Sequence, residues 1–164
     1  MELMVVVALI GILLAVATPM VMSTIPRYRL RAAARELVIN FKKAKLEAVK
    51  RNRNVVLAFT PGVGAQGGSY LIFVDANANN IYEPAPGGND IQLNNQQIGT
   101  SVLLSGTTFA GNNTGYNSRG MPLAFGNCEV RVLDDTKRFR LVLNSVGTVR
   151  LETNSGGATP WSAQ

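Results

Sequence analysis

The sequence contains no histidine and a single cysteine, Cys128, among its 164 residues. The absence of histidine excludes serine–histidine and cysteine–histidine nucleophile systems, and it removes a ligand on which most zinc sites depend. A single cysteine excludes a disulfide within the chain. No pair of acids and no nucleophile motif takes the place of these groups, so we expect a protein without catalytic residues and without a confident metal site.

Charged residues are also scarce, at 16% of the chain, and a long N-terminal stretch lacks them. From Leu3 to Met22 no residue is charged, and only Thr18 and Pro19 interrupt the apolar run. Twenty helical residues rise about 30 Å, the thickness of the hydrocarbon core of a bilayer. No basic region and no A-x-A site mark a cleaved signal peptide. We therefore interpret residues 1–25 as a membrane-spanning helix half, because a core helix is seldom apolar on every face.

The basic residues are concentrated just after this run. Ten of the sixteen Lys and Arg lie between Arg27 and Arg53, where only Glu36 and Glu47 oppose them, although the formal net charge of the whole chain is +6. Such a basic collar can lie on anionic lipid headgroups, pair with carboxylates of neighbouring copies, contact phosphates or simply face solvent.

Residues 26–53 form the second predicted helix half. An apolar stripe recurs there at helical spacing, and the other faces are basic, which predicts an amphipathic helix from about Arg27 to Lys50. Pro19 and Pro26 are predicted helix kinks between the two halves. The stripe consists of Leu30, Ala33, Ala34, Leu37, Phe41, Ala44 and Ala48.

Residues 54–164 have the pattern of a β-rich head. Short apolar or alternating runs are separated by glycine- and asparagine-rich turns, and a long loop is expected over about 76–97, with one short strand near Ile91. The last three strands alternate, so one face is expected to be buried and the other solvated. The fold class is therefore α+β, a long helix packed on an antiparallel sheet. The expected strands are "VVLAFT", "SYLIFVD", "SVLL", "TTFA", "MPLAF", "EVRVL", "RFRLVLN" and "GTVRLET".

One stretch has an approximate calcium-loop pattern. In "DANANNIYE", Asp75, Asn77, Asn79 and Glu83 stand at roughly alternate positions. The position of the glycine in an EF-hand loop is Asn80, and Pro86 replaces the bidentate acid. Side chains that cap the turns of their own loop explain the stretch equally well.

The segment "ELMVVVALIGILLAVATP" resembles the N-terminal helix of type IV pilins and pseudopilins, in which an apolar run likewise joins a lone glutamate. The head resembles the GspH/FimT branch of minor pilins and pseudopilins. The segments that carry this second resemblance are "AARELVINFKKAKLEAVKRNRNVVL", "GSYLIFVDANANNIYE", "GYNSRGMPLAF" and "LVLNSVGTVRLE".

The resemblance implies a pilin fold and a role in a helical filament. In this family the glutamate meets the N-terminal amine of the neighbouring subunit, so Glu2 would set the axial register. An acid within an apolar helix needs such a partner, because an unpaired charge is costly in hydrocarbon. The residues expected to pack in the filament core are Leu3, Val6, Val7, Ile10, Leu13 and Leu14.

The resemblance also implies a location and partners. These are the bacterial inner membrane, crossed once with the head in the periplasm, and then a pilus or pseudopilus made with copies of the chain and other pilins. An inner-membrane assembly platform, a prepilin peptidase and membrane lipid are expected partners. The positive-inside rule alone would place the collar in the cytoplasm. The family orientation is preferred, because a basic leader is expected to precede this sequence.

A DNA-binding minor pilin is the alternative function, since some members of this branch capture DNA. Its footprint would be the arginines that the alternation places on one sheet face: Arg131, Arg138, Arg140 and Arg150.

Overall fold

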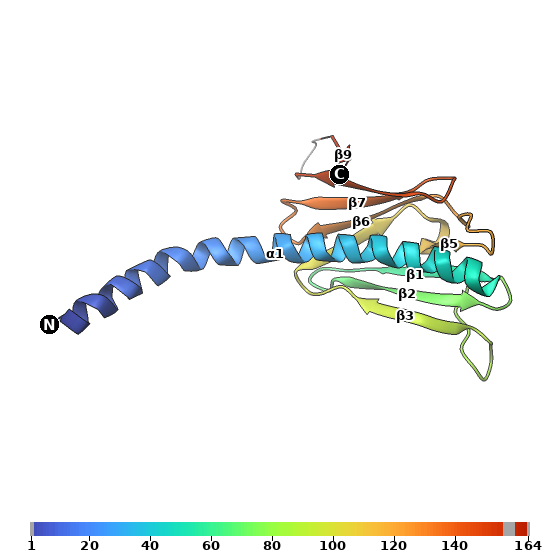
Figure 1. Ribbon diagram of the computed structural model, residues 1–164, viewed down its shortest axis with the longest axis horizontal. Helices are drawn as coiled ribbons and strands as arrows, with labels where there is room; N and C mark the ends of the chain where they lie inside the picture. Colours follow the sequence, from blue (N-terminus) through green and yellow to red (C-terminus); the bar gives the residue numbers. More distant parts are fainter. Residues whose placement is uncertain (1, 156–159, 164) are drawn as a thin grey trace.

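The computed structural model describes residues 2–155 and 160–163, without the side chains of residues 16–23. It consists of one long helix and a β head that covers the C-terminal half of that helix (Figure 1). The N-terminal half of the helix extends away from the head, which confirms the predicted α+β class with a helix packed on antiparallel sheets.

Helix α1 spans Glu2–Arg51 without interruption. The next residue, Asn52, stops the helix by adopting a left-handed conformation with φ of 51°. The amides of Asn52 and Arg53 donate to the carbonyls of Val49 and Ala48, at 3.3 and 3.2 Å. These two bonds are those of a Schellman motif, with asparagine in the place that glycine usually takes.

The helix is continuous through both Pro19 and Pro26. Figure 1 shows a gentle curve along the N-terminal half instead of a break. A proline inside a helix removes one hydrogen bond and crowds the preceding turn, yet bonds on either side can maintain the helix. The expected kinks are therefore at most part of this curve, and the side chain of Pro19 lies outside the described residues.

The head contains two antiparallel sheets where the sequence suggested one. The first has the order β3-β2-β1-β5 and the second the order β4-β6-β7-β8-β9. Near their junction, the Gly62 amide donates to the Leu104 carbonyl and the Leu104 amide donates to the Gly67 carbonyl. The strands are β1 Asn54–Pro61, β2 Gly68–Asp75, β3 Ile91–Gln97, β4 Val102–Thr107, β5 Asn113–Tyr116, β6 Gly126–Val132, β7 Arg138–Leu143, β8 Val149–Asn154 and β9 Ser162–Ala163.

The predicted helix stripe forms the centre of the core. Its members are buried except Ala33, which is half-buried and packs against the core. The helix lies across both sheets, so these side chains meet residues from each (Figure 1). Alternation in β6 and β7 also gives the predicted buried face, whereas Val149 and Leu151 of β8 are only partly buried. The fully buried members of that face are Val130, Val132, Phe139, Leu141 and Leu143.

Two sequence-based strand assignments were wrong, and so was the end of the expected loop. "TTFA" contributes its first residue to β4, and a 3₁₀ turn at Ala110–Asn112 follows it. "MPLAF" forms only an isolated bridge from Pro122 to Tyr116. The loop expected to reach residue 97 ends at residue 90, because β3 is seven residues long and pairs with β2.

Strand β5 was not predicted from the sequence. It pairs with β1, and its backbone lies very near that of β1 at Gly115. A Cβ at Gly115 would lie 2.1 Å from the carbonyl oxygen of Val55, so only glycine permits this approach. The glycine that weakens the strand pattern in the sequence is thus the residue that allows the strand to pair.

Candidate functional site: the exposed helical arm and the charged faces of the head

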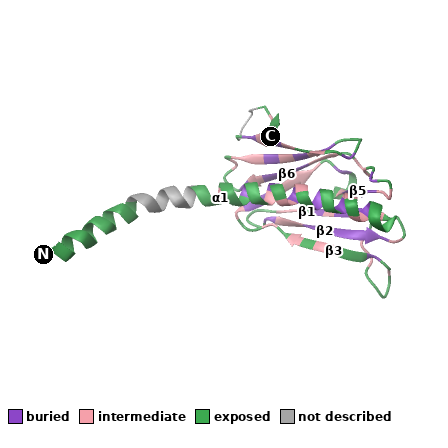
Figure 2. Cartoon of the chain, in the orientation of Figure 1, coloured by how far each residue is buried: buried purple, intermediate pink, exposed green. Residues whose placement is uncertain are grey.

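The N-terminal half of α1 extends beyond the head as an arm (Figure 1), and residues 2–15 of this arm are all exposed (Figure 2). Each of its six predicted filament-core residues is between 51% and 81% exposed. A contiguous apolar surface of this kind normally marks a site that binds protein or membrane. The six residues are Leu3, Val6, Val7, Ile10, Leu13 and Leu14.

The structure describes the predicted membrane span over part of its length only. Within the residues that the structure describes, no helical segment combines the length and the hydropathy needed to cross a bilayer. The expected run from Leu3 to Met22 includes residues 16–22, whose side chains lie outside the described part.

Glu2 lies in the first turn of α1 and is exposed. A carboxylate in this position is favoured by the partial positive charge of the helix N-terminus. It forms no ion pair with any residue that the structure describes. A positively charged group from outside the described chain could therefore pair with it.

The structure brings the four predicted arginines together on the outer face of β6–β8, and each has an acidic partner. Arg140 lies 2.6 Å and Arg150 3.2 Å from Glu152. Arg131 lies 3.2 Å from Asp135. Arg138 pairs with Asp135 and, at 3.4 Å, with Glu129. Three carboxylates thus offset most of the positive charge that a DNA footprint would need.

This face is less solvated than the alternation suggested. Glu152 is buried, and the Arg140 guanidinium lies 4.3 Å from the centre of the Trp161 ring. The C-terminal strand β9, which follows Trp161, pairs with β8. Backbone pairing of β9 and the contact of Trp161 with Arg140 together hold residues 161–163 against the sheet.

Glu152 makes the free energy of unfolding depend on pH in the acid range. The hydrogen bond from Arg140, more than any other contact, holds the pKa of Glu152 below its usual 4.5. A lowered folded-state pKa adds stability above pH 4.5 that is lost as the pH falls through the folded value. We expect Glu152→Gln to destabilise the protein at pH 7 and to lose this difference from wild type as the pH falls through the folded-state pKa of Glu152, below 4.5. Denaturation at each pH measures the effect. Glu36→Gln is the control, since Glu36 has no ion pair among described residues, and an equal pH dependence in both variants would contradict the assignment.

The suggested calcium-loop residues hold their own loop together. Both carboxylate oxygens of Asp75 accept backbone amide protons, Oδ1 from Asn77 and Ala78 and Oδ2 from Asn80, at 2.7–3.2 Å. Asn77 donates to Glu83 at 2.9 Å. Among the described residues no group of three acidic, cysteine or histidine side chains is placed to hold a metal ion. The turn-capping interpretation therefore fits the loop better than a calcium site.

Sequence reasoning missed the second anchor of this loop, Asp90. It is buried, and its two oxygens accept the amides of Ala76 and Glu83 at 2.8 and 2.9 Å. Asp75 and Asp90 thus close the loop from both ends. The sequence did offer a signal, because an acidic residue stands at each end of the loop. Asp75 is the last residue of β2, and Asp90 directly precedes β3.

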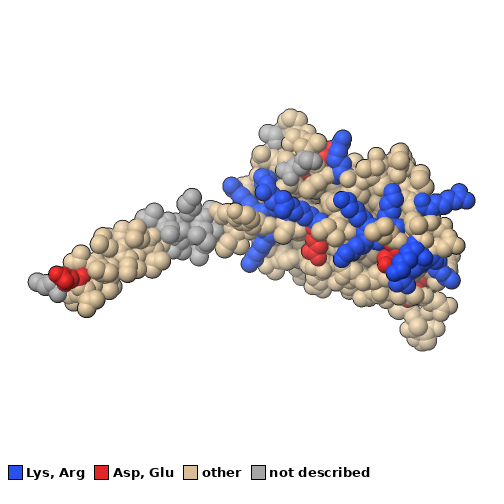
Figure 3. All heavy atoms as spheres, in the orientation of Figure 1, with Lys and Arg blue, Asp and Glu red and all other residues tan. Residues whose placement is uncertain are grey.

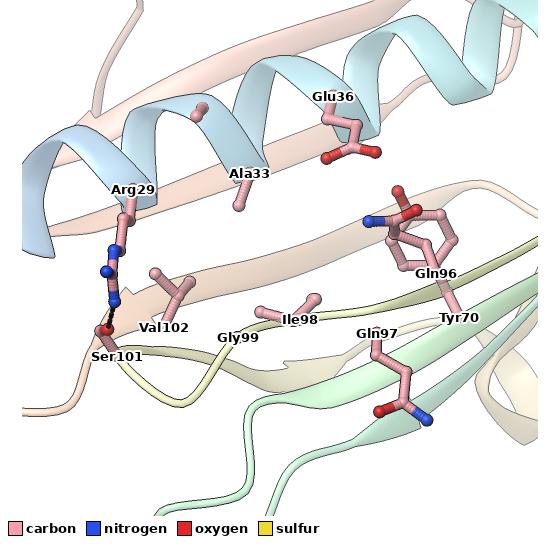
Figure 4. A pocket seen from close by; sticks show the side chains of 11 residues that line it. Arg29, Ala33, Glu36, Tyr70, Gln96, Gln97, Ile98, Gly99, Ser101 and Val102 are labelled. Atoms are coloured by element: carbon pink, nitrogen blue, oxygen red, sulfur yellow. Dashed lines mark hydrogen bonds between the residues drawn. The ribbon is translucent and has the colours of Figure 1, made fainter.

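A cavity of about 300 Å³ lies between α1, β2 and the segment that joins β3 to β4 (Figure 4). Arg29 closes one end by donating to the Ser101 hydroxyl at 2.8 Å. Near the other end the Tyr70 hydroxyl accepts a bond of 2.6 Å from Asn40, and burial raises the pKa of Tyr70 to about 12. Glu36 is the acidic residue among the described residues that line this cavity, and no second acid, cysteine or histidine stands beside it there. The thiol of Cys128 is buried elsewhere in the core, where burial raises its pKa to about 12 and keeps it protonated.

A long N-terminal helix that carries an uncovered apolar arm and packs on an antiparallel β head defines a type IV pilin or pseudopilin. The model of one family, "Type II transport protein GspH", matches residues 33–147. This match covers most of the chain, which therefore belongs to the GspH family of pilin-like proteins and confirms the resemblance found in the sequence.

One curated relative supports the same grouping. The "Pilin-like protein PilA1" of Thermus thermophilus is 42% identical over 85 residues. The match covers 51% of each protein, so the chain spans about half the length of this relative. No solved structure matches the chain significantly.

Proposed function

We propose that the chain is a non-catalytic structural subunit of a type IV pilus or a type II secretion pseudopilus. In this proposal the arm anchors it in the bacterial inner membrane, with the head in the periplasm, until it enters a helical filament of pilins. The observation that carries the proposal is the arm itself, whose large apolar residues from Leu3 to Leu14 are exposed. Membership of the GspH family supports it.

The arm suits a transfer from the membrane to the filament, because its side chains need an apolar environment in both places. Burial of one Val, Leu or Ile side chain contributes about 1.5–3 kcal/mol. Lipid tails supply that burial before assembly, and arms of neighbouring subunits supply it afterwards. The net driving force for assembly therefore comes from packing and from polar contacts instead of from removal of apolar surface from water.

Glu2 would provide the polar contact that fixes the register between subunits. Its carboxylate stands at the exposed end of the arm, and the described chain offers it no cation. In an apolar filament core, an amine from a neighbouring subunit would pair with it at a defined axial offset. The inner-membrane assembly platform and the prepilin peptidase belong to the same proposal.

Glu2→Ala tests this role. We expect the variant to enter the membrane normally but to be incorporated into filaments at least tenfold less, because the charge that selects the register is gone. The measurement is the ratio of protein in sheared filaments to protein in membranes, in cells that lack the wild-type copy. Glu2→Asp is the matched variant, since it keeps the charge and should recover part of the incorporation. Full incorporation of Glu2→Ala would identify an ordinary membrane anchor.

A DNA-binding minor pilin is the second candidate, favoured by the gathering of four arginines on β6–β8. DNA would have to compete with Glu129, Asp135 and Glu152 for these arginines. Because Glu129 and Glu152 lie on the strands of this sheet and Asp135 in the turn between β6 and β7, their negative charge would stay near the phosphates. We therefore rank DNA binding below the structural role.

A further inference from the structure

We propose that the place where the arm leaves the head binds the phosphate of an anionic phospholipid. This neck site consists of Arg27, Tyr28 and Arg31 of α1 together with Lys137, from the turn between β6 and β7. The inference rests on the proposed placement of the arm in lipid, and it assigns a ligand class and residues to the surface of the head that faces the membrane.

The cations of the neck site converge on a hollow in the surface. A cavity of about 180 Å³ is lined by Arg27, Tyr28, Arg31 and Lys137, with Thr24 and Phe139 completing its wall. Lys137 Nζ lies 5.9 Å from the centre of the Phe139 ring, which holds the lysine at the wall. None of the described residues that line the cavity is acidic, so three positive charges from two distant parts of the chain face one small space.

These cations differ from the arginines of the second sheet because they have no acidic partner in the described chain. The arginines of β6–β8 all pair with carboxylates, whereas Arg27, Arg31 and Lys137 form no ion pair with a described residue. The acids nearest to Lys137 in the chain are engaged elsewhere. Asp134 accepts bonds from the amide and hydroxyl of Thr136, and Asp135 pairs with Arg131 and Arg138.

The position of the neck along the helix fits the headgroup layer. At 1.5 Å per residue, Arg27 lies roughly 36 Å from Leu3, whereas the hydrocarbon core is about 30 Å thick and the headgroups lie just beyond it. Figure 3 shows basic side chains gathered where the bare arm meets the head. An arm that fills the hydrocarbon core would therefore hold the neck site against lipid phosphates.

Phosphate chemistry suits the groups present. Arginine donates paired N–H bonds to phosphate oxygens. Lysine adds a compact positive charge, which can approach the same phosphate from another side. The exposed Tyr28 ring next to the cations is amphipathic and suits the membrane interface, where tyrosine is enriched. The site would thus fix the depth and rotation of the subunit in the membrane before assembly.

The experiment compares lipid retention by the full-length chain in neutral detergent, measured by native mass spectrometry. The lipids are phosphatidylglycerol and phosphatidylcholine. We expect the wild type to retain phosphatidylglycerol at least tenfold better, and the triple variant Arg27→Gln, Arg31→Gln, Lys137→Gln to retain both lipids equally. The matched control Lys42→Gln, Lys43→Gln, Arg119→Gln removes the same charge from positions elsewhere and should behave as wild type. Near-UV circular dichroism verifies the fold of each variant, and Lys137→Gln alone should give a partial loss.

Several results would overturn the inference. Equal retention of both lipids by the wild type would show that no anionic headgroup is selected, and an equal loss in the control would reduce the site to general charge. Displacement of phosphatidylglycerol by inorganic phosphate at the same concentration would identify a soluble anion as the ligand. Reduced filament incorporation with unchanged lipid retention would make the neck an interface for acids of a neighbouring copy. Failure of the proposed function is separate, because Glu2→Ala tests assembly and leaves the neck site intact.

Discussion

Phe41→Ala is expected to lower the free energy of unfolding by about 3–5 kcal/mol, the usual cost of deleting a buried phenylalanine side chain. Phe41 is fully buried on the face of α1 that meets the head. Its ring lies 6.1 Å from that of Phe59 in a stacked arrangement and 6.5 Å from that of Tyr116 in an edge-on one. The alanine variant would leave a cavity that this rigid group of rings cannot fill.

Chemical denaturation of the full-length chain in detergent, followed by near-UV circular dichroism, measures this loss. Leu46→Ala is the matched control, because Leu46 lies on the same helix but is 70% exposed, and it should change stability by less than about 0.5 kcal/mol. Equal effects of the two variants would mean that α1 does not depend on its docking face. We expect the arm to keep its helical signal in both variants, since it makes no contribution to this core.

The helix and its docking face could be predicted from the sequence because both depend on local periodicity. Residues such as Leu30, Leu37 and Phe41 recur at intervals that place them on one side of a helix, whatever they pack against. The buried face of β6 and β7 was predictable for the same reason, since alternation fixes which side chains share a side. The family was recognisable because the lone Glu2 and the apolar run are adjacent in the chain.

The division into two sheets was not predictable, because it depends on which distant strands pair. Strand β5 pairs Tyr116 with Val55, although the two lie far apart in the chain, and its short polar sequence has no alternating pattern. Strand β3 is rich in asparagine and glutamine, so it was only suggested near Ile91. In both cases an established neighbouring strand determines the structure, and propensity contributes little.

The partners of the charged side chains were also not predictable from the sequence, because they too depend on strand pairing. Alternation placed Arg138, Arg140 and Arg150 on one face, and the structure does gather them there. That Glu152 stands opposite Arg140 follows only from the register of β7 with β8. Whether an arginine is available to a ligand is therefore a property of strand pairing, and the neck cations were distinguishable from the sheet arginines only after the fold was known.

Asp75→Ala is expected to release the loop of residues 76–90 and to lower the free energy of unfolding by about 3 kcal/mol. Its carboxylate accepts three backbone amide protons, and hydrogen bonds to a charged group contribute about 1.5–3 kcal/mol each, without strict additivity. Two residues that it holds, Ala78 and Asn80, have φ of 61°, a conformation that non-glycine residues seldom adopt unaided. Without the carboxylate these turns have no compensation for that backbone strain.

Amide hydrogen exchange locates this effect better than global denaturation. We expect protection of the amides of Asn77, Ala78 and Asn80 to fall sharply in Asp75→Ala and to fall less in Asp75→Asn, which keeps one acceptor oxygen in place. Millimolar calcium should leave the exchange of wild type unchanged, because both oxygens of Asp75 already accept amide protons. If calcium slowed exchange in wild type but not in Asp75→Ala, the loop would be a cation site, and its amides would have to turn away from Asp75 when the ion binds. The same three amides thus distinguish a loop that closes on its own backbone from one that an ion closes.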